Sequence, residues 1–476
     1  MSKQPQIADL CVIGAGPAGF SVAALAAQLG ARVVLIERET VGGSFGGMVA
    51  ACALTASAGA ADGARHADRF GVRAGPVTVE MDAVRMCIRS AVAAAAPNVS
   101  EARAAGLGVT VMKGAARFVG PDAVAVGDSR ARARRFVIAT GSQPLIPPIP
   151  GLESVPFLTE RTALDLDPVP GRLVVLGGEA AGIGYAQAFV RLGIAATVVA
   201  PEGLLPREDP ELVAVVRTAL RGDGVAIVEG TTVVRVEGDA NAVAIVTAAK
   251  GEMRRIDGTH LLVNSGRRPA IAGLGLEQAR IAASERGIAV DAGLRTGNRR
   301  VYAVGGCIGG FGSVDAGDQA GIVIRRALFR LPARATRVPP RVVLTAPELA
   351  HVGLTESEVR RATADLVVLR WPFAENDRAR AERTTAGMVK ILTTRRGRIL
   401  GASLVGPRAG ELVPVWALAI GKGLRIRDLA EMPVASPTLA EVGARIAQSA
   451  LLPRLLSPMT RRLVRLLGKL DRAFPP

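Results

Sequence analysis

Three closely spaced glycines near the start of the chain have the spacing of a phosphate-binding turn. Gly14, Gly16 and Gly19 directly follow an apolar run at positions 10–13, which is long enough for a buried strand. In such a unit the first glycine makes a tight turn, the second lets the backbone approach a pyrophosphate, and the third lets a helix pack on the sheet. The N–H groups that open this helix face the phosphates. We expect these residues to bind a dinucleotide: Gly14, Ala15, Gly16, Pro17, Ala18 and Gly19.

The elements that must position this turn have the order of a βαβ unit. Positions 21–29 are rich in alanine and predict a helix, and positions 33–36 form a second apolar run that ends at Glu37. A carboxylate at that point can accept hydrogen bonds from a ribose. Strand, turn, helix, strand and acid together predict an occupied dinucleotide site, and an empty unit of the same fold is the less favoured alternative.

A second unit of the same design begins at position 172. A strand leads into a turn with Gly177 and Gly182, and a helix at 183–192 and a strand at 195–199 follow. Glu179 occupies the place of the middle glycine. A like-charge repulsion at 4 Å costs about 1 kcal/mol in water and about 4 kcal/mol at an effective dielectric constant of 20. Glu179 therefore predicts either weakened nucleotide binding at Gly177 and Gly182 or a solvated side chain in an unused site.

Length and charge limit the class of protein. A chain of 476 residues is long enough for two or three domains. The net charge is +17, but only six of the 59 basic residues are lysine, and the arginines are spread along the chain. No basic stretch alternates with aromatic residues, so we expect no nucleic-acid partner.

Targeting signals and cysteines point to a cytoplasmic protein. Positions 1–8 are polar and do not form a signal peptide, and glycines and charges interrupt every apolar run before it reaches the length of a membrane span. The four cysteines show no CxxC pair, so we expect no metal site and no disulfide framework. They are Cys11, Cys52, Cys87 and Cys307.

From position 41 the chain resembles the flavoprotein disulfide reductases, also called class I pyridine nucleotide-disulfide oxidoreductases, which include dihydrolipoamide dehydrogenase and mercuric reductase. The stretch 41–54, Val-Gly-Gly-Ser-Phe-Gly-Gly-Met-Val-Ala-Ala-Cys-Ala-Leu, aligns with the family's redox-active turn. Phe45 and Ala50 stand at the positions of its two cysteines, and Leu54 replaces its flavin-facing lysine. Neither Phe nor Ala can form a thiolate, so the resemblance implies no dithiol chemistry. Cys52 lies about 200° around a helix from Ala50, and we expect inert packing there rather than a single-thiol mechanism.

The resemblance covers roughly residues 8–450 and includes further flavin segments. Positions 135–142 resemble the strand and turn that close over the flavin nucleotide, and 301–306 resemble the ribityl-binding segment. Gly306 replaces the family's aspartate there, which removes a charge-assisted hydrogen bond worth roughly 1.5–3 kcal/mol. In the second dinucleotide unit Gly184 and Ala200 stand where the family has acids. The resemblance adds these cofactor-binding residues: Gly43, Ser44, Ala115, Thr140, Gly141, Ser142, Arg267, Gly305 and Gly306.

The C-terminal part resembles the family's dimerisation domain and implies a homodimer. At 435–441 the chain reads Ala-Ser-Pro-Thr-Leu-Ala-Glu, so Ser436 replaces the family's histidine while Glu441, which would orient it, is retained. A serine cannot act as a base near neutral pH. We therefore assign no catalytic residue, and we interpret His66, His260 and His351 as surface or structural histidines.

The resemblance implies an α/β fold with two Rossmann-like dinucleotide-binding domains and a C-terminal α+β dimerisation domain. The FAD-binding domain would take residues 1–150 and 271–335, the NAD(P)-binding-like domain 151–270, and the dimerisation domain 336–450. Residues 451–476 form a basic amphipathic tail. We expect this tail to pack on the dimer or on a partner protein rather than to lie on a membrane surface.

Two functions remain open from the sequence. The first is a FAD-binding oxidoreductase that passes electrons from NADH or NADPH to a small acceptor other than a disulfide, such as a quinone, because a flavin alone can carry that chemistry. The alternative is a catalytically silent flavin-binding homologue that acts as a structural or regulatory partner. The intact first turn favours the enzyme, Glu179 and Gly306 favour the silent homologue, and we favour the enzyme.

Overall fold

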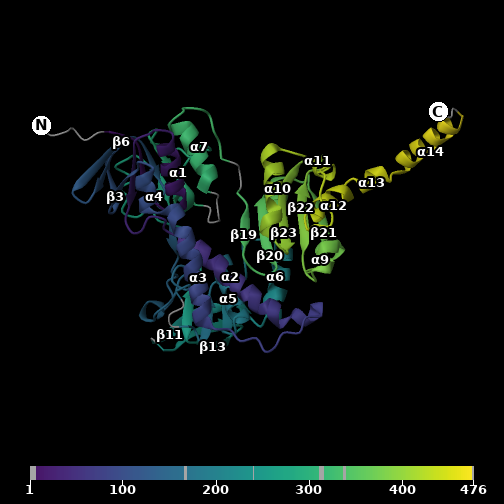
Figure 1. Ribbon diagram of the computed structural model, residues 1–476, viewed down its shortest axis with the longest axis horizontal. Helices are drawn as coiled ribbons and strands as arrows, with labels where there is room; N and C mark the ends of the chain where they lie inside the picture. Colours follow the sequence, from purple (N-terminus) through teal and green to yellow (C-terminus); the bar gives the residue numbers. More distant parts are fainter. Residues whose placement is uncertain (1–6, 166–168, 240, 310–315, 336–338, 474–476) are drawn as a thin grey trace. The chain divides into compact units, whose positions relative to one another are not determined.

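The computed structural model describes residues 7–165, 169–239, 241–309, 316–335 and 339–473. The chain divides into two compact units (Figure 1). The first unit comprises Met1–Pro206 and Leu220–Thr336, and the second comprises Arg207–Ala219 and Arg337–Pro476.

The first unit is built around a seven-stranded sheet whose central strands are parallel. Ile13 lies opposite Ile36 on one neighbouring strand and opposite Ile138 on the other, so three strands end at the same edge. Helices α1 and α7 pack together over one face, above a buried apolar core. The strands are β1 (Ala8–Ile13), β2 (Val33–Glu37), β3 (Thr110–Lys113), β4 (Ala116–Gly120), β5 (Ala123–Val126), β6 (Ser129–Ile138) and β18 (Val301–Ala303), and the helices are α1 (Pro17–Gln28) and α7 (Ala316–Ala327).

The second dinucleotide unit is a four-stranded parallel sheet in the same compact unit of the chain. Its order is β10-β9-β8-β14, and an antiparallel sheet of β11, β12 and β13 accompanies it. The elements are β8 (Arg172–Leu176), α5 (Ala180–Arg191), β9 (Ala195–Ala200), β10 (Ala226–Glu229), β11 (Thr232–Gly238), β12 (Val243–Ala249), β13 (Glu252–Gly258) and β14 (His260–Val263). Two short strands, β7 (Ser142–Pro144) and β15 (Arg267–Pro269), pair with each other.

Helix α2 (Phe45–Arg65) differs from the expectation that no segment has the length and hydropathy of a membrane span. By length and composition alone it meets that criterion. Its buried residues, Ala50, Leu54, Ala58 and Ala61, follow one helical face, and α2 packs against α3 (Met81–Ala95) and α5. We therefore interpret α2 as a packing helix, because a single buried stripe against protein elements is the pattern of an amphipathic core helix.

The second unit contains a five-stranded antiparallel sheet in the order β19-β20-β23-β22-β21. Helix α10 packs on β20 and β23, and α12 packs on β21 and β22. The side chains of Phe373 and Trp416 are fully buried in the resulting core. The elements are α6 (Pro210–Gly222), which begins in this unit, β19 (Arg341–Val343), β20 (Glu348–Gly353), α8 (Glu356–Ala362), β21 (Val367–Pro372), β22 (Met388–Thr393), β23 (Ile399–Gly406), α10 (Ala409–Lys422), α12 (Glu441–Ser449), α13 (Leu452–Leu455) and α14 (Pro458–Ala473).

Candidate dinucleotide-binding sites

The first glycine turn lies between β1 and α1 at the edge where β1, β2 and β6 end. Gly14 has a φ of +98°, and a Cβ atom there would lie 2.5 Å from the carbonyl oxygen of Ala139. A Cβ on Gly19 would overlap the carbonyl oxygen of Gly14. Around Gly16, by contrast, no described residue apart from its chain neighbours places an atom within 4 Å of an added Cβ. The turn is therefore closed on its sheet side and open at the position where a pyrophosphate would approach.

Glu37 is held beside this turn at the end of β2. One carboxylate oxygen accepts a hydrogen bond from the N–H of Ala15 at 2.7 Å, and the other accepts from the N–H of Glu39 at 2.8 Å. The N–H of Gly42 donates to the carbonyl oxygen of Ala15 at 2.9 Å, and a Cβ on Gly43 would lie 3.1 Å from the Cα of Gly16. The segment 41–44, which includes Ser44, thus packs onto the glycine turn.

The strand end of β6 supplies the opposite wall of this site. Thr140, Gly141 and Ser142 follow β6, and the hydroxyl and carbonyl oxygens of Ser142 accept hydrogen bonds from Arg267 at 2.8 and 2.7 Å. Arg267 also forms an ion pair with Glu160. Burial lowers the pKa of the Arg267 guanidinium.

Gly305 and Gly306 complete this wall after β18. A Cβ on Gly306 would lie 2.8 Å from the hydroxyl oxygen of Ser142, and a Cβ on Gly305 would lie 3.5 Å from that of Ala18. The space of an aspartate Cβ at 306 is therefore occupied by Ser142. Ala115 lies on the link between β3 and β4, where the preceding Gly114 donates its N–H to the carbonyl oxygen of Glu37 at 2.9 Å.

These residues together fit FAD. The open space at Gly16, the helix that begins at Pro17 with no side-chain cap, and the fixed carboxylate of Glu37 match the phosphate and ribose chemistry of a dinucleotide. We find that every residue predicted for the first site lies at this sheet edge or on a segment that contacts it.

Residues 45–54 form the start of α2. Ala50 and Leu54 are buried, whereas Cys52 is exposed. The interpretation of Cys52 as a buried packing residue is therefore wrong. Its thiol faces away from the buried stripe, since two residues rotate a helix by about 200°.

The second glycine turn has the same backbone design but a different residue at its centre. Gly177 has a φ of +115°, and the N–H of Gly182 donates to the side-chain oxygen of Asn264 at 2.8 Å. Glu179 is half-buried and precedes α5 in an extended conformation, with no hydrogen bond from its side chain to cap the helix. Gly184 and Ala200 are both buried. Asn264, which has no place in the glycine pattern, fixes the start of α5.

In the second unit, Ser436 and Glu441 remain close together. The Ser436 hydroxyl and the N–H of Thr438 lower the pKa of the Glu441 carboxyl, and the Thr438 N–H donates to it at 3.1 Å. His351 is buried, with Nδ1 2.7 Å from the Ser403 hydroxyl and Nε2 3.1 Å from the carbonyl oxygen of Gly353. Burial lowers the pKa of His351. These contacts fit the structural role expected for that histidine.

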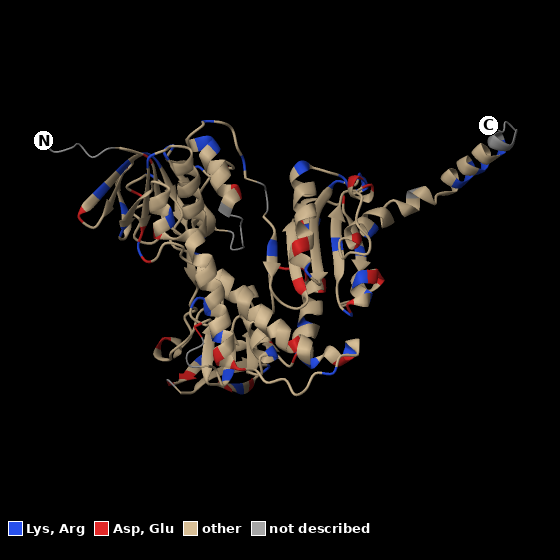
Figure 2. Ribbon diagram, viewed as in Figure 1, with Lys and Arg blue, Asp and Glu red and all other residues tan. Residues whose placement is uncertain are grey.

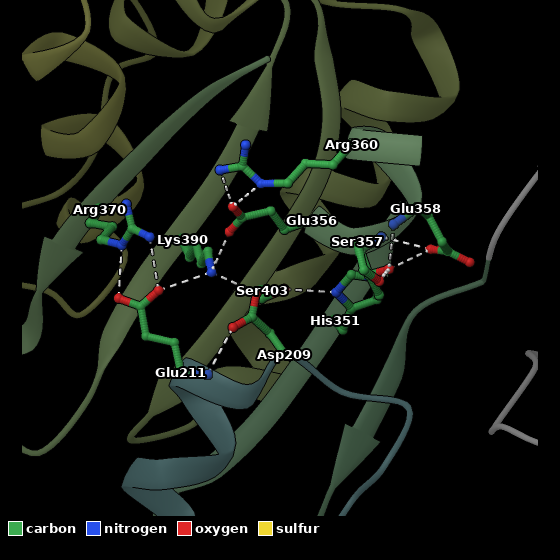
Figure 3. A network of polar contacts seen from close by, with 11 residues as sticks. Asp209, Glu211, His351, Glu356, Ser357, Glu358, Arg360, Arg370, Lys390 and Ser403 are labelled. Carbon is green, nitrogen blue, oxygen red and sulfur yellow. Dashed lines mark hydrogen bonds and ion pairs between the residues drawn. The ribbon is translucent and has the colours of Figure 1, made fainter. Parts of the chain in front are cut away.

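A network of charges in the second unit was not expected from the sequence (Figure 3). The ammonium group of Lys390 lies 2.7 Å from Asp209, 2.9 Å from Glu211 and 2.7 Å from Glu356. Arg370 contacts Glu211 at 2.7 Å. The Lys390 side chain is only 4% exposed. Burial opposes its charge, but the three carboxylates together raise the pKa of Lys390. The network joins the first turn of α6 to the five-stranded sheet.

Comparison with known proteins identifies the class to which this fold and these sites belong. The family model for pyridine nucleotide-disulphide oxidoreductases matches residues 8–321, and the model for the dimerisation domain of the same family matches residues 339–446. A dihydrolipoyl dehydrogenase from Geobacillus stearothermophilus is 33% identical over 455 residues, which cover 93% of this chain and 96% of that protein. A mercuric reductase from Streptomyces lividans has the same identity and coverage.

Solved structures agree with these matches. The HOCl-induced flavoprotein disulfide reductase RclA from Escherichia coli, solved as a Cu(II) complex, superposes with a TM-score of 0.80 at 27% identity, covering 92% of this chain and 99% of RclA. LpdA from Mycobacterium tuberculosis superposes with a TM-score of 0.81 at 27% identity, covering 94% of this chain and all of LpdA.

The fold and the paired glycine turns define a two-dinucleotide flavoprotein. The chain belongs to the pyridine nucleotide-disulphide oxidoreductase family. The α/β fold with a C-terminal dimerisation domain and the FAD cofactor are thereby confirmed, together with NAD(P)H as the reductant that the family uses. The dimerisation domain supports a homodimer.

Proposed function

We propose that this chain is a FAD-dependent oxidoreductase that passes electrons from NADH or NADPH to a small acceptor other than a disulfide, of the quinone class. The observation that carries the proposal is the pair of residues at the start of α2. Phe45 and Ala50 occupy the places of the family's redox cysteines, and Ala50 is buried. The exposed thiol of Cys52 lies on another face of α2.

The overall reaction balances without a protein thiol. FAD bound at the first site would supply two-electron transfer, so that NAD(P)H, one proton and a quinone would give NAD(P)+ and a hydroquinone. The protein residues would bind and orient: the first turn would hold the FAD phosphates, Glu37 would hold a ribose, and Gly177 and Gly182 would shape the second nucleotide site. With Ser436 at the family's histidine position, no imidazole is there to hand over a proton, so the one proton needed besides the hydride would come from solvent.

Anaerobic reduction followed by turnover tests this proposal. The purified protein, reconstituted with FAD, is titrated with NADH and NADPH, and we expect the flavin absorbance to bleach. Turnover is then measured with menadione and, in parallel, with dihydrolipoamide, glutathione disulfide and mercuric ion. We expect quinone reduction and no disulfide or mercuric reduction above the free-flavin background.

A grafted pair of thiols provides the matched comparison. The double variant Phe45→Cys, Ala50→Cys restores the family's cysteine spacing, and we expect it to gain disulfide reduction while quinone reduction continues. Disulfide turnover by the parent chain would contradict the proposal. A flavin that neither NADH nor NADPH bleaches would instead indicate the silent homologue.

We also propose that the tail docks on an anionic membrane surface and that the protein works in the cytoplasm. The sequence favours packing on protein, and exposure of the apolar side chains of α14 in the single chain fits either a protein or a membrane surface: Met459 is 79%, Leu463 53% and Leu466 56% exposed. Arg461, Arg462, Arg465 and Lys469 lie on the same helix, and Figure 2 shows basic residues along it. A basic amphipathic helix of this kind binds in the membrane interface.

Vesicle flotation tests the tail. We expect the protein to float with phosphatidylglycerol vesicles and not with phosphatidylcholine vesicles, and the variant Leu463→Asp, Leu466→Asp to lose flotation. Equal behaviour of both proteins with both lipids would point to packing on a second copy or a partner protein.

A further inference from the structure

A cavity of about 530 Å³ in the first unit is lined mainly by arginines. Six of its ten lining residues are arginine, which exceeds the share expected from the composition of the chain. The arginines are Arg135, Arg295, Arg299, Arg326, Arg330 and Arg334. We name this set the arginine pocket.

The arginine pocket lies away from the first glycine turn. Arg295 and Arg299 precede β18, whereas Gly305 of the flavin site follows the same strand. Arg326 lies in the last turn of α7, and Arg330 and Arg334 follow that helix. Figure 2 shows basic residues at the C-terminal end of α7. The pocket therefore opens at the opposite edge of the sheet from the FAD site.

The position of Arg326 is fixed by its surroundings. Its guanidinium lies 3.2 Å from Asp291 and donates to the carbonyl oxygen of Ala333 at 3.4 Å. A Cβ on Gly293 would overlap the Arg326 guanidinium, so the glycine leaves room for it. The Arg326 side chain is only 21% exposed. At least one guanidinium is thus held in place before any ligand arrives, which lowers the entropic cost of binding.

Among the described residues, the protein balances the charges of the pocket only in part. Asp291 is paired with both Arg326 and Arg295, the latter at 3.7 Å. Within the described part of the chain Arg299, Arg330 and Arg334 form no ion pair. Guanidinium groups gathered in a concave space repel one another and attract anions, and the planar fork of arginine matches phosphate oxygens in a bidentate manner.

We infer that the arginine pocket binds a small polyanion that carries two or more phosphate groups. A single phosphate would neutralise only part of the charge, whereas linked phosphates reach several guanidinium groups at once. The cavity also has an apolar wall formed by Leu331 and Pro332, so the ligand can carry an organic group beside its phosphates. This site is independent of the proposed electron transfer.

Calorimetric titration of the FAD-loaded full-length protein with inorganic tripolyphosphate tests the inference. We expect tripolyphosphate to bind at least tenfold more tightly than orthophosphate, with an affinity that falls as salt rises. In the triple variant Arg299→Ala, Arg330→Ala, Arg334→Ala we expect the affinity for tripolyphosphate to fall at least tenfold.

A control variant that loses the same positive charge outside the pocket shows whether binding depends on the pocket or on the net charge of the chain. The triple variant Arg103→Ala, Arg221→Ala, Arg254→Ala removes three exposed arginines of the first unit that lie outside the pocket. We expect it to bind tripolyphosphate like the parent chain. An equal loss in both triple variants, or no preference for tripolyphosphate over orthophosphate, would overturn the inference.

The flavin absorbance and the melting temperature verify that each variant is folded. If the pocket triple variant does not fold, the single change Arg330→Ala takes its place, because that side chain is exposed and its truncation leaves no buried charge. We then expect at least a threefold loss of tripolyphosphate affinity, and an unchanged affinity would count against the pocket.

Discussion

The two glycine turns of the first unit share a backbone design and differ in what they present to a ligand. In both turns the first glycine has a positive φ, +98° at Gly14 and +115° at Gly177, and the residue before the helix is extended. The first turn presents the bare backbone of Gly16 in that place, and the second presents the carboxylate-bearing Glu179. A Rossmann unit can thus keep its packing while its ligand chemistry changes. The first and third glycines pack the turn on the sheet, whereas the middle position faces the ligand.

The largest expected effect comes from equivalent glycine changes in the two turns. Gly19→Ala places a methyl group on the carbonyl oxygen of Gly14, and we expect the purified protein to lose its bound flavin. Gly182→Ala crowds Asn264 in the second turn and should leave the flavin absorbance intact while impairing reduction by NADH. Absorbance after desalting measures the first effect, and stopped-flow bleaching measures the second. Loss of flavin from both variants would show that the two turns are not independent.

In the second compact unit, a buried charge network around Lys390 contributes to stability rather than to ligand binding. Lys390→Met leaves three carboxylates facing one another without their cation, and we expect a loss of about 3–5 kcal/mol in the free energy of unfolding. Urea denaturation followed by tryptophan fluorescence reports on this unit, because both tryptophans of the chain, Trp371 and Trp416, belong to it. Lys422→Met is the matched control at an exposed lysine. Ser436→Ala should have no comparable effect.

Replacing Glu179 tests whether this residue weakens nucleotide binding at the second glycine turn. We expect Glu179→Gly to raise the affinity for NADH or NADPH by roughly tenfold or more, since a like charge near a pyrophosphate costs a few kcal/mol in a partly buried site. Glu179→Gln removes the charge but keeps the side chain, so it separates repulsion from crowding. Stopped-flow flavin reduction at matched salt measures both variants. Unchanged affinity in both would mean that the carboxylate already points away from the nucleotide.

The charge network of the second unit predicts a pH dependence of its stability. Arg370, together with Lys390, lowers the pKa of Glu211 from 4.5 to about 2 in the folded state. A depressed carboxyl pKa stabilises the fold above the unfolded value, and that contribution is lost as the pH falls from about 4.5 towards 2. Tryptophan-detected stability should decline over this range. In Glu211→Gln the decline should be shallower, and an unchanged slope would remove Glu211 from the explanation.

The smallest expected effect is at the exposed thiol. Cys52→Ala should leave the rate of flavin reduction and of quinone turnover unchanged, because Cys52 lies off the buried face of α2. Steady-state rates of the two proteins provide the measurement, with Cys87→Ala as a second exposed-cysteine control. A variant without activity would make Cys52 a single-thiol redox residue.

The amino-acid sequence by itself determined the family and the fold class, and it predicted the place of the first site. Apolar runs that end in Gly14 and Glu37 require a buried strand, a turn and a neighbouring strand, and local spacing is sufficient to predict them. The identities of Phe45, Ala50 and Ser436 are also local facts. The exposure of Cys52 was missed, because which side of α2 is buried depends on α3 and α5, whose packing no local pattern specifies.

Only the tertiary structure decided which distant charges meet. Lys390 and Asp209 are 181 positions apart, yet they form a buried ion pair because α6 begins against the five-stranded sheet. The six arginines of the pocket are scattered between positions 135 and 334, and along the sequence they look like part of an even spread of basic residues. The pairing of β18 with β6 and the packing of α7 over them bring these arginines together. Local pattern specifies strands and turns because it acts over a few residues, whereas a charge cluster depends on contacts that only the folded chain makes.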